Sequence, residues 1–200
     1  MPLVATMMAM MLLTGLATVL ILGTMTETAV VASYRRGIEA FYAADAAAEF
    51  AVRDLAGAPD WDAVVDGDAW STFVDGAPGG TRRVGAATID LTQATAEVGP
   101  MVAARSDHAL VGLQLYAYGP FGDLAPSAAD RPPMYLCVWV AEFADDEADE
   151  PPAERVLHVI ARAYGSTGGQ RSVVVTVARP ADSDGDGDSP LELRSWEELR

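Results

Sequence analysis

The residue types that most often perform covalent catalysis are few in this chain and poorly arranged for it. Ser106, Asp107 and His108 are the types that form a hydrolase triad, but three chain neighbours cannot adopt the mutual geometry of a triad. They instead indicate a polar turn before a strand. His158 and Cys137 lie within apolar stretches, which favours a surface or sheet-packing histidine and a buried small hydrophobic residue. We therefore identify no catalytic residue and expect neither enzymatic activity nor a cofactor.

Carboxylates alternate in the acidic segment Asp182–Asp188, as they do in the first half of a calcium-binding EF-hand loop. The twelfth position of such a loop, normally a bidentate glutamate, is Leu193 here, and Pro190 interrupts the segment. A solvated acidic linker is therefore the favoured interpretation, with calcium binding as the alternative. We assign no metal ligand from the sequence.

The charge balance excludes several classes of partner. The chain has 200 residues with 29 acidic and 13 basic side chains, a formal net charge of -16, and every basic residue is arginine. Nucleic acid is not an expected partner, because binding its phosphates requires a basic surface.

The single cysteine excludes an internal disulfide framework and a multi-cysteine metal site. No pattern identifies a small-molecule substrate.

The N-terminal region predicts a membrane-spanning helix. Residues 1–26 carry no charged side chain, and Leu3–Gly23 is a nearly continuous apolar run. A helix of about 20 apolar residues crosses the ~30 Å hydrocarbon core, and threonine hydroxyls can bond back to helix carbonyls. A cleaved signal peptide would have a basic start and a shorter apolar stretch, so the span is favoured. We assign residues 1–26 to the transmembrane half of a longer helix, in contact with the lipid bilayer.

The helical pattern continues beyond the apolar run and becomes amphipathic. Residues 27–57 lack proline and are rich in alanine, and Gly57 followed by Pro59 predicts the end of the helix. The two halves predict one helix from Leu3 to Ala56, about 80 Å long. Side chains at helical spacing form a stripe that we expect to pack on the rest of the protein: Tyr34, Ile38, Phe41, Ala48, Val52 and Leu55.

Runs of Val, Ile, Leu and aromatic residues after this helix predict strands. No helical pattern lies between the runs, so we expect an antiparallel meander with one face on the stripe. The predicted strands are residues 109–118, 134–143, 155–164 and 172–178, with a weaker strand at 88–91.

These elements predict an α+β fold in which the second half of the long N-terminal helix packs against an antiparallel sheet. Residues 58–180 are expected to form a β-rich globular head. Residues 181–200 are expected to form an acidic C-terminal tail.

A short pattern marks the junction of the two helical halves. A Thr/Glu segment follows the apolar run, then a basic pair, then the alanine-rich block 40–49, AFYAADAAAE. The residues that carry the pattern are Glu27, Tyr34, Arg35, Arg36, Phe41 and Asp45. This arrangement resembles the N-terminal region of PilX-type minor pilins and related type IV pilin-like proteins, in which Glu is commoner at the position of Asp45. The similarity covers roughly the first quarter of the chain.

The resemblance implies a structural minor pilin-like subunit that takes part in assembling a type IV pilus or a secretion pseudopilus. Such a subunit is single-pass in the inner (cytoplasmic) membrane with an extracytoplasmic head, and becomes part of an extracellular pilus after assembly. Its partners would be other pilin-like subunits, contacted through the N-terminal helix. Two alternatives remain from the residues alone: a single-pass anchored extracytoplasmic β-domain for binding or adhesion, and a membrane-tethered enzyme, for which no catalytic set is found.

The sequence departs from pilin precursors at its start. Such precursors carry a short basic leader ending in glycine, whereas this sequence begins inside the apolar run. Arg35 and Arg36 follow the span, and the positive-inside rule would then place the head in the cytoplasm. We therefore expect that Met1 is not the natural start and that basic leader residues precede it.

For the acidic segment we predict no calcium binding. Calorimetric titration of the full chain with calcium chloride should give the same negligible heat for wild type and for an Asp184→Ala/Asp186→Ala variant, because the ligand set lacks its bidentate glutamate. A saturable heat that is present in wild type and lost in the variant would instead establish a calcium loop.

Overall fold

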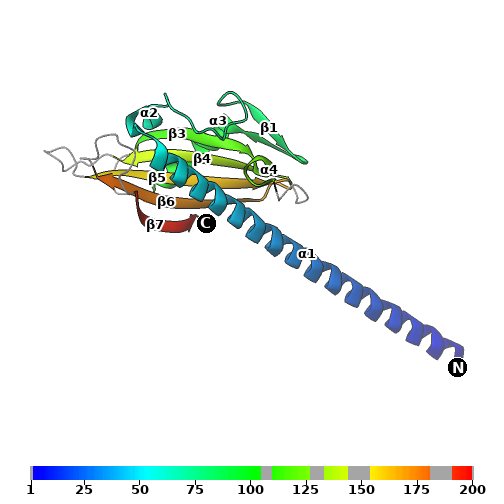
Figure 1. Cartoon of the computed structure of the whole chain (residues 1–200). Helices are drawn as coiled ribbons and strands as arrows, with labels where there is room; N and C mark the ends of the chain where they lie inside the picture. The colour runs from blue at the N-terminus through cyan, green and yellow to red at the C-terminus, as the bar shows by residue number, and fades with distance from the viewer. Residues whose placement is uncertain (1, 105–109, 127–132, 144–153, 181–190, 200) are drawn as a thin grey trace. The chain divides into compact units, whose positions relative to one another are not determined.

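The computed structural model describes residues 2–104, 110–126, 133–143, 154–180 and 191–199 (Figure 1). Its longest element is helix α1, Pro2–Gly57. The chain divides into two compact units, Met1–Ile38 and Glu39–Arg200. Helix α1 therefore contributes its first part to one unit and its last part, from Glu39, to the other. The long N-terminal helix of the predicted α+β fold is confirmed.

The second unit is built on a five-stranded antiparallel sheet with strand order β3-β4-β5-β6-β7. Each strand pairs with the one that follows it in the chain, so the predicted meander is confirmed. The strands are β3 (Leu110–Pro120), β4 (Met134–Phe143), β5 (Glu154–Gly165), β6 (Gln170–Pro180) and β7 (Glu192–Leu199).

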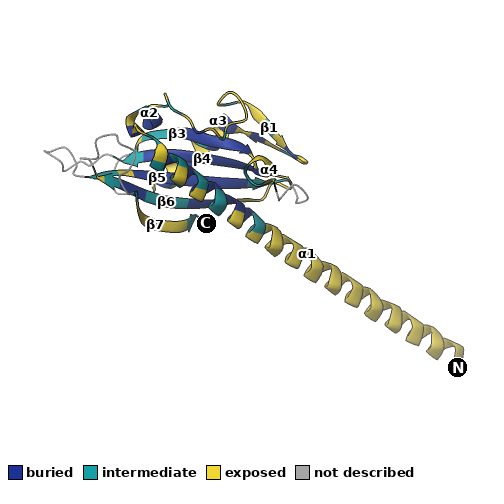
Figure 2. Cartoon of the chain, viewed as in Figure 1, coloured by how far each residue is buried: buried dark blue, intermediate teal, exposed yellow. Residues whose placement is uncertain are grey.

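The last part of α1 covers one face of this sheet with alanine side chains (Figure 2). Spacings of three and four residues place these side chains on one side of the helix. Because each projects only a methyl group, the helix backbone lies close to the Val and Leu side chains of β4, β5 and β6. The buried residues of α1 are Ala40, Ala43, Ala44, Ala47, Ala48, Ala51 and Leu55.

Strand β4 shows how the sheet divides the core into two clusters. Leu136 and Val138 belong to the cluster that contains the α1 alanines, whereas Cys137 and Trp139 belong to a second cluster on the other face. Successive side chains of a strand point to opposite faces. Since both faces are covered, every residue from Met134 to Ala141 is buried, which explains why this strand is apolar throughout.

A β-hairpin and a helix supply the cover of the second face. The hairpin turns at Gly85, whose φ of 61° suits the first position of a tight two-residue turn. Asp90 then caps the helix, because its Oδ1 accepts hydrogen bonds from the backbone N–H groups of Thr92 (2.9 Å) and Gln93 (3.0 Å). The elements are β1 (Thr81–Val84), β2 (Ala87–Asp90) and α3 (Leu91–Ala103), and two short helices, α2 (Trp61–Val65) and α4 (Phe121–Leu124), flank β3.

Helix α3 is the main element that the sequence interpretation missed. Gly99 and Pro100 within it are typical of loops, and they hide the helical pattern. The helix nevertheless buries Leu91, Val98 and Val102, which lie on one side of it. Packing on the sheet and the Asp90 cap therefore outweigh two poor helix formers.

The predicted boundary of the head is also wrong at its C-terminal end. Glu192–Leu199 was expected within an acidic tail, but it forms β7 and pairs with β6, with Trp196 opposite Val175. Four of its eight residues are charged and only Leu199 is buried, as befits an edge strand. Residues 181–190, which include the aspartates of 182–188, and residue 200 lie outside the described residues.

The expected packing stripe is partly corrected. Ala48 and Leu55 are buried, and Phe41 and Val52 are half-buried against the same cluster. Tyr34 and Ile38 belong to the first unit and are 72% and 38% exposed, so the prediction is wrong for them. The larger side chains of the stripe were expected to form the contact. The residues that α1 buries against the sheet are instead mostly alanines.

We predict that Ala44→Leu destabilises the second unit, because it forces three extra carbon atoms into the closely packed helix–sheet contact. The expected loss is about 1–3 kcal/mol of unfolding free energy, measured by urea unfolding of the full chain in detergent. All four tryptophans lie in the second unit, so their emission reports its unfolding. The control is Ala32→Leu on the exposed part of α1. Equal urea midpoints for the two variants would contradict the close contact.

Candidate functional site: the faces of helix α1

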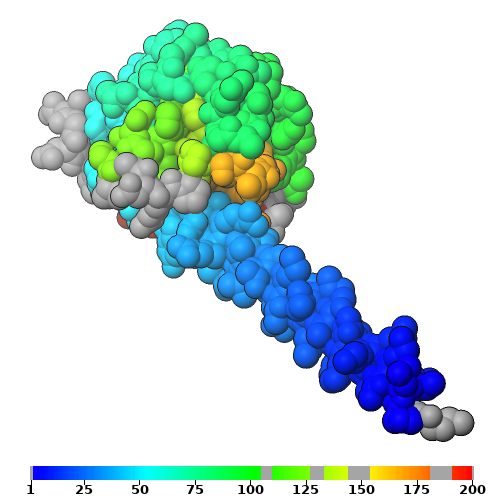
Figure 3. Space-filling model, turned by 90° about the vertical axis from the view of Figure 1, so that its right-hand side faces the viewer, coloured from blue at the N-terminus to red at the C-terminus, as the bar shows by residue number. Residues whose placement is uncertain are grey.

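The first part of α1 presents an apolar surface (blue in Figure 3). Every large apolar residue from Leu3 to Val31 is at least 59% exposed. A continuous apolar surface of this extent is not stable in water and indicates a membrane or another apolar partner. The helix is also long and apolar enough to cross a membrane, so single-pass anchoring is compatible with its length and composition.

Threonines within this apolar part make internal hydrogen bonds. The hydroxyls of Thr6, Thr14 and Thr18 each donate to a backbone carbonyl three or four residues earlier, at 2.8 Å. Thr24, Thr26 and Thr28 do the same over the following turns. These bonds satisfy the hydroxyl protons without water, which is the arrangement that a hydrocarbon environment requires.

The first residues of the pilin-like pattern lie on the exposed helix surface that follows. Glu27, Tyr34, Arg35 and Arg36 are all exposed. The guanidinium of Arg36 donates through Nε to the carbonyl of Ala32 at 3.1 Å. This stretch therefore presents polar and charged groups directly after the apolar part of the helix.

The last two residues of the pattern hold strand β7 against α1. Indole Nε1 of Trp196 donates to Oδ1 of Asp45 at 3.0 Å. The rings of Phe41 and Trp196 meet edge to face with centroids 5.6 Å apart. Trp196 was missed from the sequence, where the only signal is a single aromatic residue among the charged residues near the C-terminus.

An apolar groove lies between α1 and strands β6 and β7. Its volume is about 590 Å³. The apolar side chains that line it include Val52, Val175, Leu193 and Trp196. Leu193 and Trp196 are among the exposed large hydrophobic residues of the second unit, so this face offers apolar contact area at its surface.

Arg179 of β6 caps the end of α1. Its Nη1 donates to the carbonyl of Ala58 at 2.9 Å, and its Nη2 donates to those of Leu55 (2.9 Å) and Ala56 (3.2 Å). The guanidinium also stacks on the ring of Trp61, 4.4 Å from the centroid. Burial lowers the pKa of Arg179 from its usual value. A cation at this place satisfies carbonyls that a helix end leaves unpaired and complements the helix dipole.

The two residues considered for chemistry have structural roles. Cys137 is fully buried, which confirms the predicted buried small hydrophobic residue, and burial raises the pKa of its thiol well above the usual range. Nδ1 of His158 lies 3.1 Å from the hydroxyl of Thr176, and its ring meets Phe143 edge to face at 4.7 Å. Burial lowers the pKa of His158, as expected for a sheet-packing histidine. Ser106, Asp107 and His108 lie outside the described residues.

Across the described ranges, no group of three or more His, Cys, Asp or Glu side chains is placed to hold a metal ion. Comparison of the chain with protein-family models, with curated proteins and with solved structures found no match.

We predict that Arg179→Met lowers the unfolding free energy of the second unit by about 2 kcal/mol, because three carbonyls at the end of α1 lose a charged donor. The control is Arg171→Met on the same strand, whose guanidinium lies 3.8 Å from Glu198 and is half exposed. The control should lose less than about 0.5 kcal/mol. Tryptophan emission during urea unfolding compares the two. A larger loss in Arg171→Met than in Arg179→Met would overturn the capping role.

Proposed function

We propose that this protein is a structural, minor pilin-like subunit of a type IV pilus or secretion pseudopilus. In this proposal the first part of α1 anchors the subunit in the inner membrane before assembly, and the head is extracytoplasmic. The supporting observation is that one helix is apolar and exposed at its start and forms part of the buried core at its end. The proposal assigns no catalytic role.

The continuity of α1 favours a building block over a simple anchor. A membrane anchor for a binding domain needs only a span and a linker, and α1 shows no break between the apolar part and the alanine face. In a filament, the apolar parts of neighbouring helices bury one another when they leave the lipid.

Other surfaces of the chain support an assembly role. The charged residues Glu27 and Arg36 follow the apolar part of α1 on its exposed surface, where charge can complement a neighbouring helix. The apolar groove beside β7 adds contact area on the head. The single-pass adhesion module remains the second candidate, since it also needs an apolar N-terminal helix.

We predict that the protein appears both in the membrane fraction and in filaments sheared from the cell surface. Replacing residues 3–23 with leucine preserves an apolar span but removes the side-chain shapes through which neighbouring helices pack. The variant should stay in the membrane and be lost from the sheared fraction, as immunoblots of the two fractions would show. Thr167→Ala, an exposed head substitution, is the control and should behave as wild type.

Wild-type protein that remains only in the membrane, in cells whose sheared fraction contains other pilins, would refute the filament proposal. That result would favour the anchored adhesion module.

A further inference from the structure

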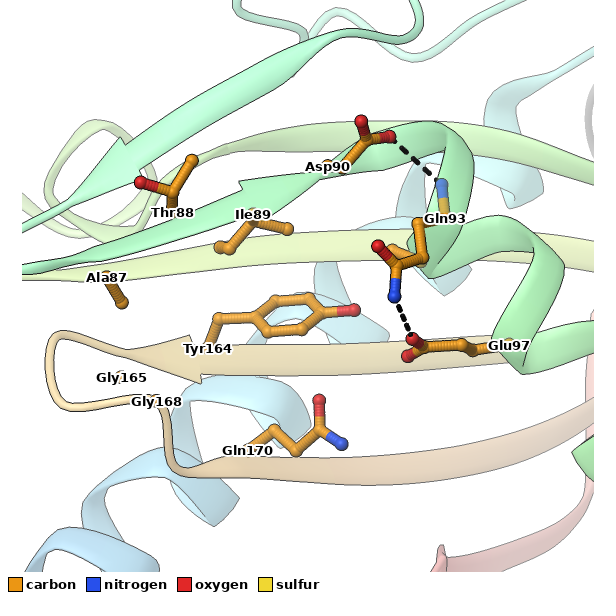
Figure 4. A pocket seen from close by; sticks show the side chains of 11 residues that line it. Ala87, Thr88, Ile89, Asp90, Gln93, Glu97, Tyr164, Gly165, Gly168 and Gln170 are labelled. Carbon is orange, nitrogen blue, oxygen red and sulfur yellow. Dashed lines mark hydrogen bonds between the residues drawn. The ribbon is translucent and has the colours of Figure 1, made fainter.

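A polar pocket of about 210 Å³ lies on the α3 side of the sheet (Figure 4). Its walls come from strand β2, helix α3 and the hairpin that joins β5 to β6. The side chains that can form hydrogen bonds in it are Thr88, Asp90, Gln93, Glu97, Tyr164 and Gln170. All of these residues belong to the second unit, so the pocket is independent of the apolar part of α1.

The helical wall of the pocket is held in place by its own hydrogen bonds. Oδ1 of Asp90 is used in capping α3, which leaves its second carboxylate oxygen for other partners. Nε2 of Gln93 donates to Oε1 of Glu97 at 2.9 Å. The amide oxygen of Gln93 remains as an acceptor, while Oε2 of Glu97 faces Arg162 at 3.9 Å. Gln170 on the opposite wall offers an amide donor and an amide acceptor.

Tyr164 contributes an aromatic surface. In Figure 4 its ring lies across the pocket with the hydroxyl directed toward Gln93 and Glu97. The hydroxyl oxygen is fully buried, with Arg162 as a neighbouring donor. Burial raises the pKa of Tyr164 to about 12. The half-buried ring is therefore the part of Tyr164 that a ligand in the pocket contacts.

A buried arginine supports the pocket from beneath. Arg162 is only 1% exposed, and its Nε donates to the hydroxyl of Ser172 at 2.8 Å. Its guanidinium carbon lies 5.9 Å from the ring centroid of Tyr164, and Nη1 lies 3.9 Å from Oε2 of Glu97. The cation thus offsets the charge of Glu97 and orders both side chains before any ligand arrives.

We propose that this pocket binds one ring of a neutral saccharide. A sugar ring presents many hydroxyls, each donor and acceptor, together with apolar C–H faces. The pocket matches this chemistry with amides, carboxylates, a hydroxyl and an aromatic ring, in a volume below that of drug-sized sites. The net charge of the chain and the carboxylates of Asp90 and Glu97 oppose anions, and the polar lining opposes lipids. An organic cation would be repelled by the positive charge of Arg162, whose Nη1 lies 3.9 Å from Oε2 of Glu97.

Saturation-transfer NMR on the full chain in a sugar-free detergent tests this inference. The probes are the methyl glycosides of glucose, galactose, mannose and N-acetylglucosamine, with choline and inorganic phosphate as the competing chemistries. We expect transfer to at least one glycoside with millimolar affinity. A Gln93→Ala/Gln170→Ala variant should bind it about tenfold more weakly, because two hydrogen-bonding side chains are lost.

The matched control is Thr167→Ala, which is exposed in the same β5–β6 hairpin and does not line the pocket. It should bind the glycoside as wild type does. Three results would overturn the inference. The first is no transfer to any of the four glycosides, and the second is equal glycoside affinity in the double variant and the control. The third is binding of choline or phosphate in place of the glycosides. None of these outcomes depends on filament assembly, so the proposed function is tested separately.

Discussion

The close approach of the α1 alanine face to the sheet is the constraint on which the rest of the head depends. Methyl side chains at Ala44, Ala47 and Ala51 let the helix backbone lie against Val and Leu side chains with little space between. This contact determines which residues of β4, β5 and β6 face the helix. It also makes the last part of α1, from Ala40 to Leu55, a core element of the head.

Polar contacts then fix where along its length α1 meets the sheet. Arg179 and Trp61 bind the carbonyls at the end of the helix, where the indole of Trp61 donates to Leu55 at 3.1 Å. At the residue directly before Leu55, the hydroxyl of Tyr116 donates to the carboxylate of Asp54 at 2.8 Å. Near the start of the buried face, Asp45 accepts from Trp196. A face of alanine methyl groups would allow the helix to shift along its axis relative to the sheet. The directional hydrogen bonds near both ends of the buried face therefore set the position of the helix.

The opposite face of the sheet follows a different principle. There the cover is α3 and a small hairpin, and the boundary includes a buried arginine held by Ser172 and two aromatic rings. Polar groups at this depth must be satisfied, and they rigidify the walls around Tyr164 and Glu97. The sheet thus has an apolar helix contact on one face and a cover that includes buried polar groups on the other.

The long helix, the antiparallel meander and the burial of Cys137 could all be predicted from the sequence. These follow from local periodicity and composition, which a continuous segment carries within itself. Only the tertiary structure decided that alanines form the contact, that α3 forms despite Gly99 and Pro100, and that the charged segment Glu192–Leu199 is a strand. It alone brought Trp196 to Asp45, 151 positions away, and Arg179 to Leu55, 124 positions away. Such pairs leave no local pattern, because their energy exists only when the intervening chain has folded.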